Sequence, residues 1–140
     1  MNETPAIKWR RMIREGGMRA YRPAAGADVE TDFRRFLERE LDRSLRELST
    51  NTEAARVALF VLAVALLTYG RLDMVELILS NAPPPDTHLS AFSSALRELL
   101  PLPKEIDPRH VQHVRDWLAE HRQTLRWNDN AGRFEEALAP

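Results

Sequence analysis

The chain has 140 residues, and 20 Lys and Arg against 21 Asp and Glu give a formal net charge of −1. This length fits one domain with a core of its own, and the near-zero charge excludes a protein held to nucleic acid by a general excess of positive charge. The chain has no cysteine, which removes disulfides and thiolate sites. Because the first residues also lack the apolar run of an export signal, we expect a cytoplasmic protein.

The N-terminal residues predict a short helix followed by a loop. Thr4 and Pro5 suit the N-cap and the first helical position, and the pair at residues 16–17, Gly-Gly, suits the end, so we expect a helix over residues 5–15. Glycine, proline and alanine follow without periodicity. We therefore expect a single domain over residues 1–140 whose N-terminal helix and loop, residues 1–27, could move against the rest.

This N-terminal helix is locally basic. Residues 1–23 carry six Lys or Arg and two acidic residues, an excess of 6 − 2 = +4. Two interpretations stay open. The helix binds an acidic groove, RNA or an anionic membrane surface, or it folds back on the core through Ile7, Trp9 and Ile13.

The next segment predicts a long amphipathic helix that starts after Asp28, a good N-cap. Apolar residues recur at spacings of three and four, and they are Val29, Phe33, Phe36, Leu37, Leu41, Leu45 and Leu48. The opposite face mixes Arg and Glu. We interpret it as a solvated face with weak ion pairs, and a docking surface is the alternative.

A strongly apolar helix is predicted over residues 53–69. Its uncharged run between Arg56 and Arg71 lasts 14 residues, short of the roughly 20 that a membrane-spanning helix needs. Residues 57–67 are apolar on every side, so this helix has no solvent face and must be the centre of the core.

Gly70 ends this helix, and a second one is predicted over residues 72–82, before three prolines at 83–85. Residues 54–87 resemble a single tetratricopeptide repeat through Leu59, Leu62, Ala63, Leu66, Gly70, Val75, Leu79 and Ala82. The chain departs from that pattern because Leu66 replaces an aromatic residue, Val75 replaces alanine, and no second copy lies 34 residues away. The resemblance implies a protein-recognition scaffold, whereas any helical hairpin with a tight glycine turn gives a similar pattern.

The remaining chain predicts two more helices and a hairpin. A fifth helix follows Asp86 or Thr87 with Leu89, Phe92, Leu96 and Leu99 inward, and a sixth begins at Asp107 and runs to residue 122 with Val111, Val114, Trp117 and Leu118 apolar. Residues 124–135 surround a cluster of turn-formers and suit a β-hairpin. The predicted fold is all-α, a bundle of five to six helices around residues 53–69 with a short C-terminal β-hairpin.

No motif in the sequence predicts an enzyme, a metal site or a cofactor. His110, His113 and His121 lack the partners of a metal motif, and Ser93-Ser94 lacks a nucleophile elbow. Phosphate-binding glycine loops are also missing from the sequence. We therefore expect a non-enzymatic protein without cofactors.

The function predicted by elimination is a protein–protein interaction module, which is an adaptor, a complex subunit or a protein that neutralises one partner. The predicted partner-binding surface consists of Lys8, Trp9, Arg10, Arg11, Arg14, Tyr69, Arg71 and Asp73. The alternative is a DNA-binding protein whose C-terminal third is similar to a winged helix, with contacts from Arg109, Arg115, Arg122, Arg126 and Arg133. The partner and a homo-oligomeric state stay open, as does the choice between a DNA-binding wing and a structural cap for the hairpin.

Overall fold

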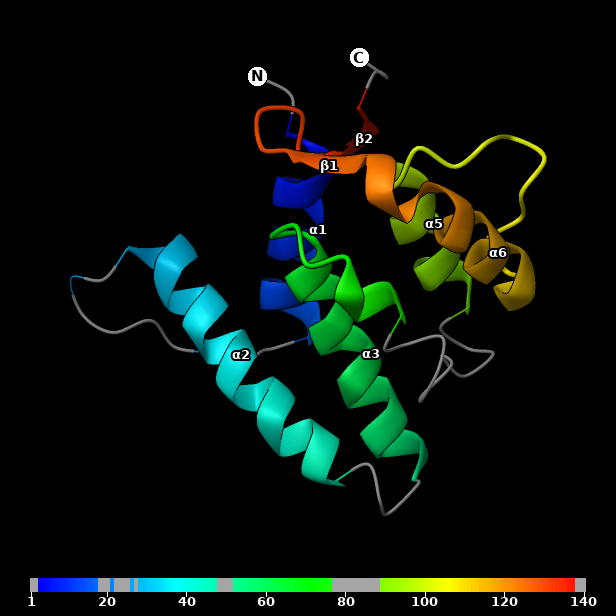
Figure 1. Cartoon of the computed structure of the whole chain (residues 1–140). Coiled ribbons are helices and arrows are strands. Elements are labelled where there is room, and N and C mark those ends of the chain that lie inside the picture. Colours follow the sequence, from blue (N-terminus) through cyan, green and yellow to red (C-terminus); the bar gives the residue numbers. More distant parts are fainter. Residues whose placement is uncertain are drawn as a thin grey trace.

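The structure is a computed structural model that describes residues 3–17, 21, 26, 28–47, 52–76 and 89–137. Helices make up most of this part of the chain, and the sheet found there is a two-stranded antiparallel hairpin near the C-terminus (Figure 1). The predicted all-α bundle with a short C-terminal hairpin is therefore confirmed.

The N-terminal helix folds back on the core. α1 (Pro5–Met12) starts as predicted, because the Thr4 side chain accepts a hydrogen bond from the backbone N–H of Ile7, and the chain continues as a π-helix, η1 (Ile13–Gly17). Trp9 and Ile13 are buried, as expected for a helix that folds back on the core. Ile7, which was expected to face the core with them, is 47% exposed, and Ala6 is buried in its place. Most of the loop predicted after residue 17 lies outside the described residues.

α2 (Val29–Glu47) packs along α3 (Glu53–Leu67), and the two helices run side by side (Figure 1). α2 buries Phe33, Leu37, Leu41 and Ser44. The prediction that Leu45 faces inward was wrong, because Ser44 continues the inward row and Leu45, one position further round the helix, is 38% exposed. Val29 is exposed to a similar extent, and Leu48 lies outside the described residues.

α3 is the central helix, as predicted, although Ala58, inside the run that was expected to have no solvent face, is exposed. The Thr52 side chain caps it by accepting a hydrogen bond from the backbone N–H of Ala55, and residues 62–67 are all buried. The helix ends at Leu67, two residues before the predicted end, and Gly70 turns the chain at a φ of +89°. Among the described helices, none is long and apolar enough to cross a membrane.

The helical hairpin that resembles a tetratricopeptide repeat is only partly described. Residues 73–76 are helical, and Val75 is fully buried. Leu79 and Ala82, which the resemblance also uses, lie outside the described residues. The resemblance therefore stays a prediction.

α5 (Leu89–Leu99) buries Phe92, Leu96 and Leu99 as predicted. α6 (Val111–His121) begins four residues later than the predicted start at Asp107. Asp107 instead closes a turn, because its carboxylate accepts the backbone N–H of Arg109 at 3.0 Å and its carbonyl accepts that of His110 at 2.9 Å. This local turn replaces the expected helix start.

The C-terminal hairpin follows a short 3-10 turn, η4 (Arg122–Thr124), and pairs β1 (Leu125–Asn128) with β2 (Arg133–Glu136). It lies across the beginning of α1 (Figure 1), where the backbone N–H of Ala6 donates to the carbonyl of Gly132 at 3.0 Å. Phe134 is buried and makes an edge contact with the half-buried Trp127. The hairpin is thus packed against the helices.

Candidate functional site

Glu30, at the start of α2, is the meeting point of three segments. Its carboxylate lies 3.2 Å from the Arg10 guanidinium and 3.4 Å from that of Arg14, and it accepts the Tyr69 hydroxyl at 3.3 Å. The same hydroxyl also reaches the Glu30 backbone carbonyl at 3.2 Å. We call Glu30, Arg10, Arg14 and Tyr69 the Glu30 cluster, because it ties α1 and η1 to α2 and to the end of α3.

Arg10 is the most deeply placed cation of this cluster, with a side chain only 12% exposed. It donates to the carbonyl of Thr68 at 2.6 Å and to the Thr68 hydroxyl at 3.1 Å. Its guanidinium also stacks 3.9 Å from the centre of the Tyr69 ring. A cation at the C-terminal end of α3 faces the negative end of the helix dipole. Arg10 therefore stabilises the junction of the helices.

The chemistry of Tyr69 fits the same structural role. Burial raises the pKa of Tyr69, and the negative charge of Glu30 raises it further, which outweighs the opposite effect of Arg10. The phenol consequently stays protonated near neutral pH and acts as a hydrogen-bond donor. A tyrosine used as a general base would need its pKa moved in the opposite direction.

The other cations of α1 are also paired within the chain. Lys8 and the indole N–H of Trp9 both bind the carboxylate of Glu98 on α5, at 2.5 and 2.6 Å. Burial alone would raise the pKa of Glu98, but the hydrogen bonds from Lys8 and Trp9 outweigh it and lower that pKa. Arg11 makes a two-pronged pair with Glu3 at 2.7 and 2.8 Å.

The structure thus divides the predicted partner-binding surface. Arg10, Arg14 and Tyr69 come together at Glu30, whereas Lys8 and Trp9 face α5. The last two predicted residues form a separate pair, with 3.0 Å between the Arg71 guanidinium and the Asp73 carboxylate. Partner binding by these residues stays a prediction, and all eight of them have bonding roles inside the protein.

Four of the five arginines predicted as DNA contacts bind groups of the same chain. They are Arg109 with Asp107, Arg122 with Glu76, Arg126 with the carbonyls of Gln123 and Leu125, and Arg133 with that of Leu100. Arg115 is exposed and has no bonded partner in the part of the chain that the structure describes. The DNA-binding alternative stays a prediction. Residues 100–110, before α6, form turns where a winged helix needs a second helix.

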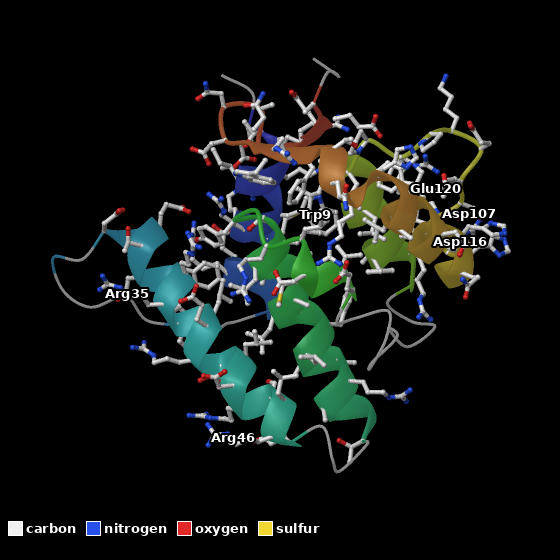
Figure 2. The ribbon with its side chains drawn as sticks, in the orientation of Figure 1. Trp9, Arg35, Arg46, Asp107, Asp116 and Glu120 are labelled. Carbon is white, nitrogen blue, oxygen red and sulfur yellow. The ribbon has the colours of Figure 1, made fainter. Side chains whose placement is uncertain are left out.

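The outer face of α2 presents a different kind of basic surface. Arg35, Arg39, Arg43 and Arg46 follow one another at spacings of four, four and three residues, so they share one side of the helix. All four are exposed, and Figure 2 shows Arg35 and Arg46 projecting away from the body of the protein. We call these residues the arginine ridge.

The bonding within the ridge differs from one arginine to the next. The Arg43 guanidinium lies 3.6 Å from the Glu40 carboxylate, and Arg46 donates to the carbonyl of Asp42 at 3.3 Å. Arg35 and Arg39 have no ion pair or hydrogen bond to any residue in the described ranges. A docking surface on this Arg and Glu face was the alternative interpretation of the sequence, but these four arginines were not singled out, although their spacing could have revealed the ridge.

An apolar groove of about 260 Å³ lies between α1, η1, α3 and α5. Its walls include Ile13 and Trp9 on one side and Phe60, Val61 and Val64 on the other. With so few polar atoms, the groove suits an apolar side chain better than a polar substrate.

The histidines that the sequence singled out do not converge. The ring centres of His110, just before α6, and of His113 lie 5.2 Å apart, and both residues are exposed. The ring of His121 stacks on that of Trp117, with 4.7 Å between their centres. No three His, Asp or Glu side chains are grouped to hold a metal ion within the described parts of the chain.

Comparison with known proteins does not place this chain in a family. No family model, curated protein or solved structure matches it. Its function therefore has to be inferred from the geometry of the Glu30 cluster and the arginine ridge.

Proposed function

We propose that this protein is a non-enzymatic protein–protein interaction module that binds its partner through the outer face of α2. The observation that carries the proposal is the arginine ridge. Four arginines share one exposed helix face, and Arg35 and Arg39 have no bonded partner among the described residues. The arginines of α1 and η1, in contrast, bond to acidic side chains of the same protein.

The ridge has the chemical character of an interface surface. Each guanidinium offers five N–H donors in a planar fork that matches a carboxylate, and arginine is enriched at protein interfaces. α2 is held in place by Phe33, Leu37 and Leu41 against the core. Because the ridge stands on a rigid helix, binding would order few groups beyond the arginine side chains themselves.

The test is capture of partners from the native cells by the tagged full chain, with and without nuclease. The double variant Arg35→Glu, Arg39→Glu is compared with wild type, and Arg115→Glu on α6 is the matched control for an exposed arginine elsewhere. We expect one protein in stoichiometric amount that survives nuclease, is lost with the α2 variant and is kept by the control. A captured protein that disappears with nuclease, or that the α2 variant retains in full, would contradict the proposal.

The eight residues predicted from the sequence can be tested in the same assay. Arg11 suits this purpose, because its side chain is 43% exposed and its pair with Glu3 joins two residues of the same N-terminal segment. Loss of the captured protein with Arg11→Glu, but not with the α2 variant, would move the interface to α1.

A further inference from the structure

We infer that the arginine ridge binds an acidic α-helix of the partner protein, whose carboxylates repeat at the spacing of the ridge. This inference rests on the proposed function and adds the chemistry of the partner. Its basis is the periodicity of the ridge, the acidic residues beside it and the aromatic side chain along its edge.

The periodicity of the ridge matches another helix. From Arg35 to Arg46 the chain advances eleven residues, which is about 16 Å at a rise of about 1.5 Å per residue. Successive arginines are therefore about 5 to 6 Å apart along the helix axis. A second helix with glutamates at spacings of four, four and three would place one carboxylate opposite each guanidinium, as charged residues do along paired helices.

The acidic residues near the ridge disfavour a nucleic acid. Asp42 lies on the same exposed side of α2 as Arg35 and Arg46, and Glu38 and Glu47 belong to the same helix. A nucleic-acid backbone carries a phosphate at every nucleotide and would meet these carboxylates, whereas a protein helix can place a neutral or basic side chain there. The net charge of −1 for the whole chain also gives little of the general attraction on which phosphate binding depends.

An aromatic side chain lies beside the ridge. Phe36 is only partly buried. Arg39 and Arg43 follow it at spacings of three and then four residues, so Phe36 lies next to the arginine ridge on the surface of α2. On the core side, its ring packs against those of Phe33 and Tyr21, with 6.3 and 5.0 Å between the ring centres. A partner helix therefore gains an apolar contact if it carries a leucine next to its glutamates, and interfaces commonly combine such an anchor with arginine.

The experiment uses the full chain and a fluorescent synthetic helical peptide with glutamates at the spacing of the ridge and one leucine beside them. A control peptide has the same composition, with the glutamates distributed around the helix. Anisotropy should show that the spaced peptide binds at least about tenfold more tightly than the control peptide. Arg35→Glu, Arg39→Glu should weaken this binding by about tenfold or more. Arg115→Glu should leave it unchanged, and unaltered circular dichroism confirms that both variants fold.

Several outcomes would overturn the inference. In the peptide assay, these are equal binding of the two peptides, no binding of either, and full binding by the α2 variant. A single-stranded RNA that binds the ridge more tightly and displaces the peptide would also overturn it. So would a dimer of the chain that the substitutions Arg35→Glu, Arg39→Glu dissociate. If the captured cellular protein depends on the ridge while the spaced peptide fails to bind, the acidic-helix inference fails and the proposed function stands. If no captured protein depends on the ridge, the proposed function fails.

Discussion

α1 and α2 are both rich in arginine, but their arginines face different environments. Arg10 and Arg14 of the N-terminal segment pair with Glu30 at the helix junction, whereas Arg35 and Arg39 of α2 are exposed and bond to nothing in the described part of the protein. The difference teaches that a high count of basic residues does not by itself locate a binding surface. What matters is whether the basic side of a helix faces its own protein.

The two helices need their arginines to different degrees. α1 has 8 residues and buries only Ala6 and Trp9, so apolar packing alone contributes little to keeping it in place. α2 has 19 residues and buries a full row of side chains against the core. The short helix therefore depends on polar bonds to Glu98, Thr68 and Glu30, while the long helix can present its arginines to a partner.

The largest expected effect comes from α3, against which α2 and η1 pack. Leu66 is fully buried, and Leu66→Asp would place a carboxylate in an apolar site at a cost of several kcal/mol, comparable to the stability of a small domain. We expect the variant to lose its helical circular dichroism. Ala58→Asp, an exposed position of the same helix, is the control and should stay folded, and an unchanged Leu66→Asp spectrum would refute α3 as the core.

The next effect tests how firmly α1 is docked. Gly132 has a φ of +67°, and a Cβ added there would lie 2.4 Å from the Cβ of Thr4, the N-cap of α1. Gly132→Ala should therefore lower the free energy of unfolding by roughly 3 kcal/mol, from backbone strain and overpacking together. Gly26→Ala separates the two causes, since Gly26 has a φ of +77° and open space around it. Thermal unfolding of the two variants measures both losses of stability. Equal losses would mean that a Cβ at Gly132 does not clash with Thr4 of the α1 N-terminus.

A smaller loss is expected from the cation that joins α1 to α3. Arg10→Ala removes charged hydrogen bonds to Thr68 and the pair with Glu30, which should cost about 2 kcal/mol. Arg11→Ala removes a pair between two side chains that are each more than a third exposed, and it should cost clearly less than Arg10→Ala because solvent screens such a pair. Chemical denaturation of both variants measures the difference, and equal losses would remove the special role of Arg10.

The smallest effect is a dependence on pH. The pKa of Glu98 in the folded protein lies below its ordinary value of 4.5, so its contribution is complete above about pH 4.5 and is lost as the pH falls through the folded pKa. Glu98→Gln should be less stable than wild type by about 1 kcal/mol near neutral pH. The two proteins should become alike in strong acid. Thermal unfolding at several pH values checks this, and a difference that persists in strong acid would assign the effect to something other than the charge.

Local signals in the sequence predicted much of the fold. Thr4 caps the helix that it was expected to cap, and the apolar run of α3 is the buried centre. The start of α6 was misplaced because Asp107 before proline suits both a helix cap and a turn, and only its bonds to residues 109 and 110 distinguish them. Periodicity alone cannot separate these two uses of aspartate.

The candidate site was harder to predict because its bonds join distant positions. Glu30 lies 20 residues from Arg10 and 39 from Tyr69, and no local pattern announces that these side chains meet. The arginine ridge is the opposite case, since its spacing is visible in the sequence of α2. What the sequence could not show is that α1 uses its arginines internally, whereas α2 presents a row of exposed ones.

The most direct measurement is thermal unfolding of two double variants side by side, Arg10→Glu, Arg14→Glu and Arg35→Glu, Arg39→Glu. The account predicts a clear loss of stability for the first, because like charges would then surround Glu30. It predicts a change within about 0.5 kcal/mol for the second, which alters exposed side chains only. The central claim is that the arginines of the N-terminal segment stabilise the fold, whereas those of α2 bind a partner. Equal losses of stability, or a larger loss for the α2 variant, would contradict it.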